Sequence, residues 1–510
     1  MKPLRKPLIS VTILMSIFVI NFANSHEGHD DKDIILKDLG NLGEVNFEIS
    51  CKAKTQKAFN TGVGLLHHMM YAQAEQLFQK WISQQPKCAM LYWGYSMSLF
   101  HPLWPDKITK EALTQGQQSL NIAQKLHKTQ REKAYITATE KYYENWETIS
   151  EKKRIKRWAD EFSQLHNDYP NDIDATAFYG LSQLVIASKK DNTFSTSKQV
   201  GAILSSIIDT HPLHPGAIHY SIHAYDNPKH AKLGLKSARA YDKIAPDVPH
   251  ALHMPTHIFV RLGEWEDANN WNSRSASAAL KYPTKGETSM HYVHALDYKV
   301  YGLLQLGEIQ EAHQTIKEIE VHHPIQNTFP TAYALSTMPA RLYLEQKNWL
   351  QASQLKVKNP IYINWEKFPQ VEAITYFSRG IGAARSNNLK SAKEDLDMLK
   401  QLYIQTKTIS PNYWAVLVNA QQKAVDAWIL FSQGKKQKAL TLLQEAALLE
   451  DSVDKNPVTP GAVLPIRELL GDMYALSGNI DAAKRAYRAS LANSPNRLYS
   501  TQGLSNLDKK

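Results

Sequence analysis

The sequence predicts an all-α fold, a solenoid of antiparallel helical hairpins. The chain has 510 residues, which exceeds what one compact core usually supports, so several domains or a repeat array are expected. Its 22 glycines and 23 prolines are a low share for a turn-rich all-β or low-complexity chain. Small and large apolar residues also recur at a fixed spacing, which is typical of helical repeats.

The recurring pattern is a small residue, an alanine twelve positions later, and a large apolar residue four positions beyond. A proline often follows. The copies start at Gly62, Val300, Gly380, Ala427 and Gly471, and the two clearest continue as Ala74, Phe78, Pro86 and Ala483, Tyr487, Pro495. Small residues let two helices approach closely, and the large ones fill the gap between neighbouring hairpins. Four glycines fall where the turn inside a hairpin favours positive φ: Gly263, Gly307, Gly434 and Gly478.

This pattern resembles the tetratricopeptide repeat, whose unit has 34 residues. The segment from Pro465 to Pro495 matches best, and weaker units can be laid over most of residues 55–497. The resemblance implies a right-handed α-solenoid whose first helices line a concave, ligand-binding surface.

The amino-terminal residues 1–25 are predicted to be a secretory signal peptide. Lys2, Arg5 and Lys6 precede an apolar run over 8–22 that is too short for a confident membrane span. Cleavage would lower the net charge from +10 to +7, because three basic residues and no acidic ones would be removed. We therefore expect a periplasmic or secreted protein without a transmembrane anchor; an uncleaved anchor is the alternative.

The rest of the chain divides at changes in composition and repeat quality. The predicted parts are a polar segment 26–44, amino-terminal repeats 45–210, histidine-rich repeats 211–326, carboxy-terminal repeats 327–450, a linker 451–463, a last repeat 464–497 and a tail 498–510. Export would place Cys51 and Cys88 in an oxidising compartment, where they could form a disulfide or stay separate buried thiols. A bridge would constrain the unfolded chain by roughly 3.5 to 4 kcal/mol.

Histidines concentrate in the middle of the chain, where ten of the 20 lie between His211 and His294. Aligned on itself, this region superposes His219 on His253 and His223 on His257, each pair 34 residues apart. Each i, i+4 pair projects from one face of a helix, and the two helices are predicted to be neighbours. In the repeat family these places commonly face the concave groove, so the resemblance implies that the four imidazoles converge there.

Neutral imidazoles with a carboxylate suit zinc, copper or iron. The candidate metal ligands are His219, His223, His253, His257, Glu287 and His291. The candidate ligand-binding residues are His219, His223, Asp226, His250, His253, His257, His294, Asp297 and Tyr301. Three interpretations remain open: a metal or catalytic centre, a polar groove for a peptide or anionic ligand, and buried structural histidines. His67 and His101 form a fainter echo that favours repeat packing.

Common nucleotide and hydrolase motifs are absent from the sequence, including the phosphate-binding glycine loop, the His-Glu-x-x-His zinc motif and the Gly-x-Ser-x-Gly nucleophile elbow. The basic run over 152–157 is interpreted as a solvated helix face, and nucleic acid is not expected as a partner of an exported protein.

Four strings are more specific than the repeat consensus: LHHMMY at 66–71, CAMLYWG at 88–94, IHYSIHAYD at 218–226 and HALHMPTHIF at 250–259. They resemble a group of exported bacterial tetratricopeptide-repeat proteins with histidine-rich repeats and no characterised activity. We expect a scaffold that binds a protein or peptide on its concave face and carries no cofactor. The alternative is a metal-binding protein or metal-dependent enzyme that uses the histidines and a transition metal.

Overall fold

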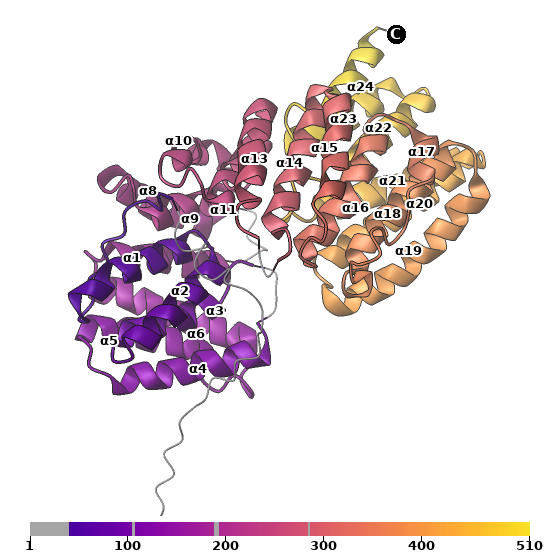
Figure 1. The fold of residues 1–510 in the computed structure, drawn as a ribbon. Coiled ribbons are helices and arrows are strands. Elements are labelled where there is room, and N and C mark those ends of the chain that lie inside the picture. The colour runs from indigo at the N-terminus through magenta and orange to yellow at the C-terminus, as the bar shows by residue number, and fades with distance from the viewer. Residues whose placement is uncertain (1–39, 105–107, 188–192, 284–285, 510) are drawn as a thin grey trace, which may run out of the picture. The chain divides into compact units, whose positions relative to one another are not determined.

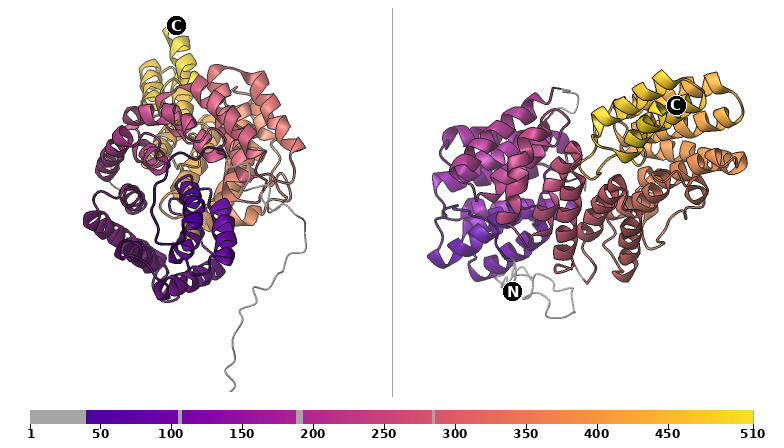
Figure 2. Two further views of the ribbon diagram at one scale, coloured as in Figure 1. Left: turned by 60° about the vertical axis from the view of Figure 1, so that its left-hand side comes forward. Right: turned by 90° about the horizontal axis from the view of Figure 1, so that it is seen from above.

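The computed structural model describes residues 40–104, 108–187, 193–283 and 286–509, and these form an all-α helical repeat solenoid (Figures 1 and 2). Consecutive helices pack side by side and are joined by short turns. Over the described ranges the only β-type pairing is a single bridge between Thr288 and Ile325. The predicted signal peptide and most of the polar segment 26–44 lie outside the described residues.

The amino-terminal repeats are built from eight helices: α1 (Ala53–His67), α2 (Tyr71–Gln84), α3 (Ala89–Leu99), α4 (Lys110–Lys125), α5 (Gln130–Tyr143), α6 (Glu151–Asp168), α7 (Ile173–Ile186) and α8 (Ser195–Thr210). Phe78 packs as the pattern predicts, because a Cβ on Gly62 or Gly94 would lie within 2.4 Å of its ring. Cys51 and Cys88 form a disulfide that ties the start of α1 to the start of α3.

The histidine-rich repeats have shorter helices: α9 (Pro215–Tyr225), η1 (Ala231–Gly234), α10 (Leu235–Ala240), η2 (Tyr241–Lys243), α11 (Pro249–His253), α12 (Pro255–Leu262), α13 (Trp265–Ala279), α14 (Met290–Leu306), α15 (Ile309–Glu318) and η3 (Ile319–Val321). Pro215 and Pro249 occupy first-turn positions, where no backbone donor is needed. Pro255 has no N–H and divides α11 from α12 at Met254.

The carboxy-terminal repeats comprise α16 (Phe329–Leu344), α17 (Trp349–Ser353), η4 (Trp365–Lys367), α18 (Pro369–Arg385), α19 (Leu389–Ile409), α20 (Trp414–Ser432), α21 (Lys436–Asp451), α22 (Ile466–Leu476), α23 (Ile480–Asn493) and α24 (Leu498–Asp508). Tyr487 packs between Gly471 and Gly503 as Phe78 does between its glycines. Gly503 belongs to α24, so the segment 498–510, which we predicted as a tail, contributes a helix to the array.

The turns inside the hairpins follow the prediction, because Gly263, Gly307, Gly434 and Gly478 all have positive φ. Together with the packing of Phe78 and Tyr487, they identify the helical hairpins as tetratricopeptide-like units. No helix in the described ranges is both long and apolar enough to cross a membrane.

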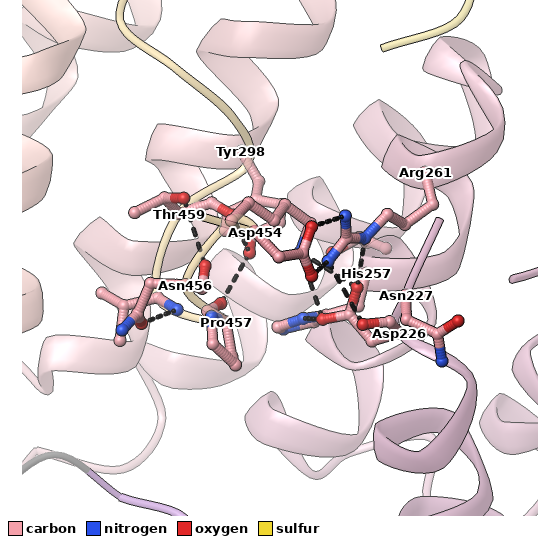
Figure 3. A network of polar contacts seen from close by, with 12 residues as sticks. Asp226, Asn227, His257, Arg261, Tyr298, Asp454, Asn456, Pro457 and Thr459 are labelled. Atoms are coloured by element: carbon pink, nitrogen blue, oxygen red, sulfur yellow. Dashed lines mark hydrogen bonds and ion pairs between the residues drawn. The ribbon is translucent and has the colours of Figure 1, made fainter. Parts of the chain in front are cut away.

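Residues 452–465 connect α21 to α22 without a helix, and we call them the strap. The strap crosses to the histidine-rich repeats, where the Tyr298 hydroxyl lies 2.8 Å from the carbonyl oxygen of Pro457 and 2.9 Å from that of Thr459 (Figure 3). On its other side, the Asn456 backbone N–H donates to the Tyr413 hydroxyl at 2.8 Å. The segment 451–463, which we predicted as a linker, covers most of the strap, and these hydrogen bonds attach it to helices on both sides.

Candidate metal centre

Neighbouring helices bring seven histidine rings into one buried region. Helix α9 carries His219 and His223, α11 carries His250 and His253, α12 carries His257, and α14 carries His291 and His294. The ring centroids of His219 and His223 are 4.9 Å apart, and those of His219 and His250 are 5.0 Å apart. The His253 ring lies 5.0 Å from His257 and 4.4 Å from His294. The 34-residue register therefore places the imidazoles on adjacent helices, as expected.

His219, His223 and His250 form the tightest group, which we call the unpartnered cluster. One nitrogen from each lies within 4.8 Å of the others. The Nε2 atoms of all three rings, and Nδ1 of His250 as well, are buried and have no hydrogen-bond partner among the described residues. A buried polar atom without a partner costs on the order of 1–3 kcal/mol, so four of them in one place need an explanation.

The position of the hydrogen on His219 is determined by its surroundings. Its Nδ1 lies 2.6 Å from the carbonyl oxygen of His67, an atom that only accepts. Nδ1 must therefore donate, and in the neutral ring Nε2 carries a lone pair that no described residue engages. A ligating histidine in a metalloprotein is usually oriented in this way, with its second nitrogen donating to a carbonyl or carboxylate.

Burial keeps these imidazoles neutral. The pKa of His223 is lowered to about 3, mainly by burial and then by the neighbouring His257. The pKa values of His219 and His250 also lie well below the ordinary histidine value, for the same primary reason. The neutral ring is the form that binds metal ions. His219 is fully buried and His250 is 7% exposed, whereas His223 is half-buried.

His253 and His257 have oriented partners of their own. His253 Nδ1 lies 2.8 Å from the amide oxygen of Asn272, and His257 Nδ1 lies 2.9 Å from Asp226 Oδ2. Their Nε2 atoms face each other at 3.1 Å. The structure therefore pairs these two histidines with each other and groups His219 and His223 with His250.

Asp226 is the hub of a charged network, and Figure 3 shows its links to His257 and Arg261. Arg261 Nε donates to Oδ1 at 2.8 Å, and Lys455 of the strap lies 3.1 Å from the carboxylate. Burial alone would raise the pKa of Asp226, but the charges of Lys455 and Arg261 outweigh it and hold the pKa well below its usual range. Both oxygens of Asp226 are thus engaged, and this residue orients His257.

Three other candidates lie in different surroundings. Asp297 accepts from Thr337 at 2.7 Å and pairs with Arg341 at 2.5 Å inside the core. The Tyr301 hydroxyl receives a hydrogen bond from Arg497 at 2.8 Å. Glu287 lies near Tyr362 and helps to raise the pKa of that phenol, after burial.

His291 and His294 remain at the margin of the cluster. The His291 ring is 5.5 Å from that of His250, and Trp104 lies 5.8 Å from His291 and 5.7 Å from His250. Burial lowers the pKa of His291 to about 4 and that of His294 to about 3. Both rings are half-buried.

Sequence reasoning missed the residues that orient the histidines: Asn272, Lys455 and the carbonyl of His67. It also underrated His67 and His68 as neighbours of the cluster. His68 is bonded through Nδ1 to the Tyr241 hydroxyl at 2.9 Å and through Nε2 to the Leu42 carbonyl at 3.0 Å. The LHHMMY string was the one signal that pointed to this pair.

Comparisons with known proteins add little. No family model and no curated protein matches the sequence. Among solved structures, the chain resembles one from the APC/C hetero-tetramer Cut9–Hcn1, with 12% identity, a TM-score of 0.31 and 89% of each chain covered. It also resembles the human IFIT1 dimer with m7Gppp-AAAA, with 10% identity, a TM-score of 0.33 and coverage of 91% of this chain and 97% of that one. Likenesses this distant carry no argument about function.

Proposed function

We propose that this chain is an exported helical-repeat protein that binds a transition-metal ion through the unpartnered cluster. The observation that carries the proposal is the set of buried Nε2 atoms on His219, His223 and His250, for which the described part of the chain offers no hydrogen-bond partner. Coordination of one ion would satisfy all three atoms at once. The same three rings are neutral and close together, as metal ligands must be.

The ligand chemistry narrows the choice of ion. Imidazole nitrogen suits zinc, copper and iron, whereas calcium and magnesium prefer oxygen ligands. Three nitrogen ligands would leave one position of a tetrahedral ion for water or another ligand.

Export is part of the proposal, and the disulfide between Cys51 and Cys88 supports it. Disulfides persist in the periplasm and outside the cell, and they are rare in the reducing cytosol. The predicted signal peptide lies outside the described residues, so this support is independent of it.

Metal binding is tested by dialysing purified protein separately against Zn²⁺, Cu²⁺ and Co²⁺ and then measuring bound metal by elemental analysis. The double variant His219→Ala, His250→Ala should lose the ion of the unpartnered cluster. The matched control is His214→Gln, since both ring nitrogens of His214 are hydrogen-bonded, to Asp174 and to the Ala217 N–H. Equal metal content in the wild type and the double variant would refute the proposed site.

A second candidate function, the binding of a peptide or protein partner, is favoured by a separate cavity of about 400 Å³ between the strap and helices α18 and α20. Tyr333 and Trp414 supply aromatic walls. The amide oxygens of Gln370 and Gln421 face no donor within the described ranges, although both atoms are buried. The N–H groups of an extended peptide would satisfy them.

This second candidate is tested with peptides selected from a random display library on the immobilised wild type. The double variant Gln370→Ala, Gln421→Ala should weaken a selected peptide about 30-fold, because two hydrogen bonds of roughly 1 kcal/mol each are removed. His219→Ala is the control and should bind the peptide normally. If a selected peptide binds the double variant as tightly as the wild type, the partner surface lies elsewhere.

A further inference from the structure

The facing pair His253 and His257 contains an electrostatic conflict. Their Nε2 atoms are 3.1 Å apart, a hydrogen-bonding distance, and both side chains are buried. A hydrogen bond between two neutral imidazoles needs one Nε2 that carries a hydrogen and one that does not. Which state each ring adopts is determined by the partner of its other nitrogen.

On His257 the hydrogen is on Nδ1. Its partner there is Asp226, which the cations Lys455 and Arg261 keep ionised and which therefore only accepts. Nδ1 must donate across the 2.9 Å contact. The Nε2 of a neutral His257 is thus a bare lone pair.

On His253 the hydrogen is also on Nδ1. The Asn272 Nδ2 group donates to the carbonyl oxygen of Ala268 at 2.7 Å, which determines how the amide is turned. The amide oxygen consequently faces His253 Nδ1 at 2.8 Å, and Nδ1 must donate to it. The Nε2 of a neutral His253 is a second bare lone pair, aimed at the first.

Two lone pairs at this distance repel unless a cation lies between or beside them. Two nitrogens bound at 2.0–2.1 Å to one tetrahedral ion would be about 3.3 Å apart, close to the spacing observed here. An acceptor behind each ligating histidine is the usual support of a metal site. We propose that His253 and His257 form a second transition-metal position, so that the histidine-rich repeats hold two neighbouring ions.

The second position is adjacent to the first and made of different residues. The rings of His223 and His257 are 6.3 Å apart, and those of His250 and His253 are 6.4 Å apart. His294, whose ring lies 4.4 Å from that of His253, is placed to become a third ligand. The inference rests on the proposed function for the class of ion, a transition metal. The choice of ligands rests on the contacts of His253 and His257 themselves.

The number of bound ions tests this inference. After equilibrium dialysis against Co²⁺, elemental analysis should give two ions per wild-type chain. The variant His253→Gln, His257→Gln should retain one ion, and His219→Ala, His250→Ala should also retain one. The second position would be overturned if the wild type binds one ion and the His253→Gln, His257→Gln variant still binds it. A proton shared by the two rings, in place of a metal ion, would give this result.

The same measurement separates the two proposals. If the wild type binds one ion and only the His253, His257 variant loses it, the metal position at His253 and His257 is supported and the metal site at the unpartnered cluster is refuted. If the wild type binds none, both fail. Far-ultraviolet circular dichroism of each variant establishes that it is folded before its metal content is compared.

A change at Asn272 tests the hydrogen-bond argument without removing a ligand. Asn272→Asp keeps an acceptor for His253 Nδ1, whereas Asn272→Leu removes it. Loss of such an outer partner typically weakens metal affinity 10- to 100-fold, so the leucine variant should lose about that factor at the second ion. The aspartate variant should stay within roughly 3-fold of the wild type. Equal affinities in the two variants would overturn the role given to Asn272.

Discussion

Among the described residues, two groups each bring three potential metal ligands close together, and the groups differ in what their nitrogens already contact. One is the unpartnered cluster. The other, which we call the bonded cluster, consists of His67, Asp174 and His214. In each group, one potential ligand atom from every residue lies within 4.8 Å of the others.

In the bonded cluster every ring nitrogen has a partner. His67 Nε2 lies 2.9 Å from Asp174 and Nδ1 lies 3.0 Å from the Tyr220 hydroxyl. His214 Nε2 lies 3.3 Å from the same Asp174 oxygen, and its Nδ1 accepts from Ala217 N–H at 3.1 Å. A metal ion would have to break these bonds, whereas at the unpartnered cluster it would break none. Hydrogen bonding, and not spacing, therefore distinguishes a candidate metal site from a packed core.

The largest expected difference is in stabilisation by metal. With free Zn²⁺ at 1,000 times the dissociation constant of a site, each bound ion should raise the free energy of unfolding by about 4 kcal/mol, because the ion binds the folded state only. His214→Gln should show the same increase, and His219→Ala, His250→Ala should lose the part due to the unpartnered cluster. Urea unfolding with and without Zn²⁺ measures it. A loss in the His214 variant instead would reverse the comparison.

Without metal, the bonded cluster should matter more to stability. Asp174→Ala removes the charged acceptor of two histidines and should lower the free energy of unfolding by about 3 kcal/mol, at 1.5 or more for each bond to a charged group. Asp174→Asn keeps one acceptor oxygen, so its free energy of unfolding should lie between those of the wild type and the alanine variant. Urea unfolding in a chelator provides the measurement. An unchanged midpoint for the alanine variant would show that these bonds contribute no stability.

Buried His68, which follows His67 of the bonded cluster in the chain, should also make stability depend on pH. Burial, the largest effect, lowers the pKa of His68 to about 3, whereas the unfolded chain takes up that proton near pH 6.5. The folding free energy that depends on neutral His68 is therefore complete above pH 6.5 and is lost as pH falls toward 3. Between pH 6.5 and 5 this loss amounts to about 2 kcal/mol.

His68→Gln should remove this part of the pH dependence while lowering stability at pH 7. The quantity to compare is the difference in unfolding free energy between pH 7 and pH 5, measured by urea titration in a chelator. His127→Gln is a suitable control, since His127 lies on the exposed turn between α4 and α5. The same difference in wild type and His68→Gln would contradict the assignment of a neutral, buried His68.

The smallest expected effect is a gain in stability when a histidine of the unpartnered cluster is replaced. His250→Leu replaces a ring with two unpartnered nitrogens by an apolar side chain, and it should raise the stability of the metal-free protein by about 1 kcal/mol. His214→Leu is the matched change in the bonded cluster and should destabilise instead. Thermal unfolding in a chelator distinguishes the two, and a destabilised His250→Leu would indicate that this ring already has a partner.

The sequence predicts the fold well because the repeat pattern is local. The residues that pack together in a hairpin, such as Gly62 and Phe78, lie sixteen positions apart, and glycines with positive φ mark the turns of four other hairpins. The 34-residue register likewise predicted that His219 and His253 occupy neighbouring helices. Whether the rings hold metal stays a prediction.

The grouping of the histidines could not be predicted, because tertiary contacts determine it. The carbonyl that orients His219 belongs to His67, 152 residues away, and Lys455 reaches Asp226 across 229 residues. Pro255 also divides the helix that carries His253 from the one that carries His257. The alignment of the sequence on itself treats the two histidine pairs as equivalent. In the structure, His253 and His257 face each other, whereas His219 and His223 group with His250.

The strap has a consequence for the order of events during synthesis. Asp226 leaves the ribosome more than 200 residues before Lys455 does, so the repeats around α9 to α12 can fold while this carboxylate still lacks its buried ammonium partner. We therefore expect the orientation of His257 to be completed only when nearly the whole chain has been made. A chain truncated before the strap would keep its histidines but lack the ammonium group that lies beside Asp226.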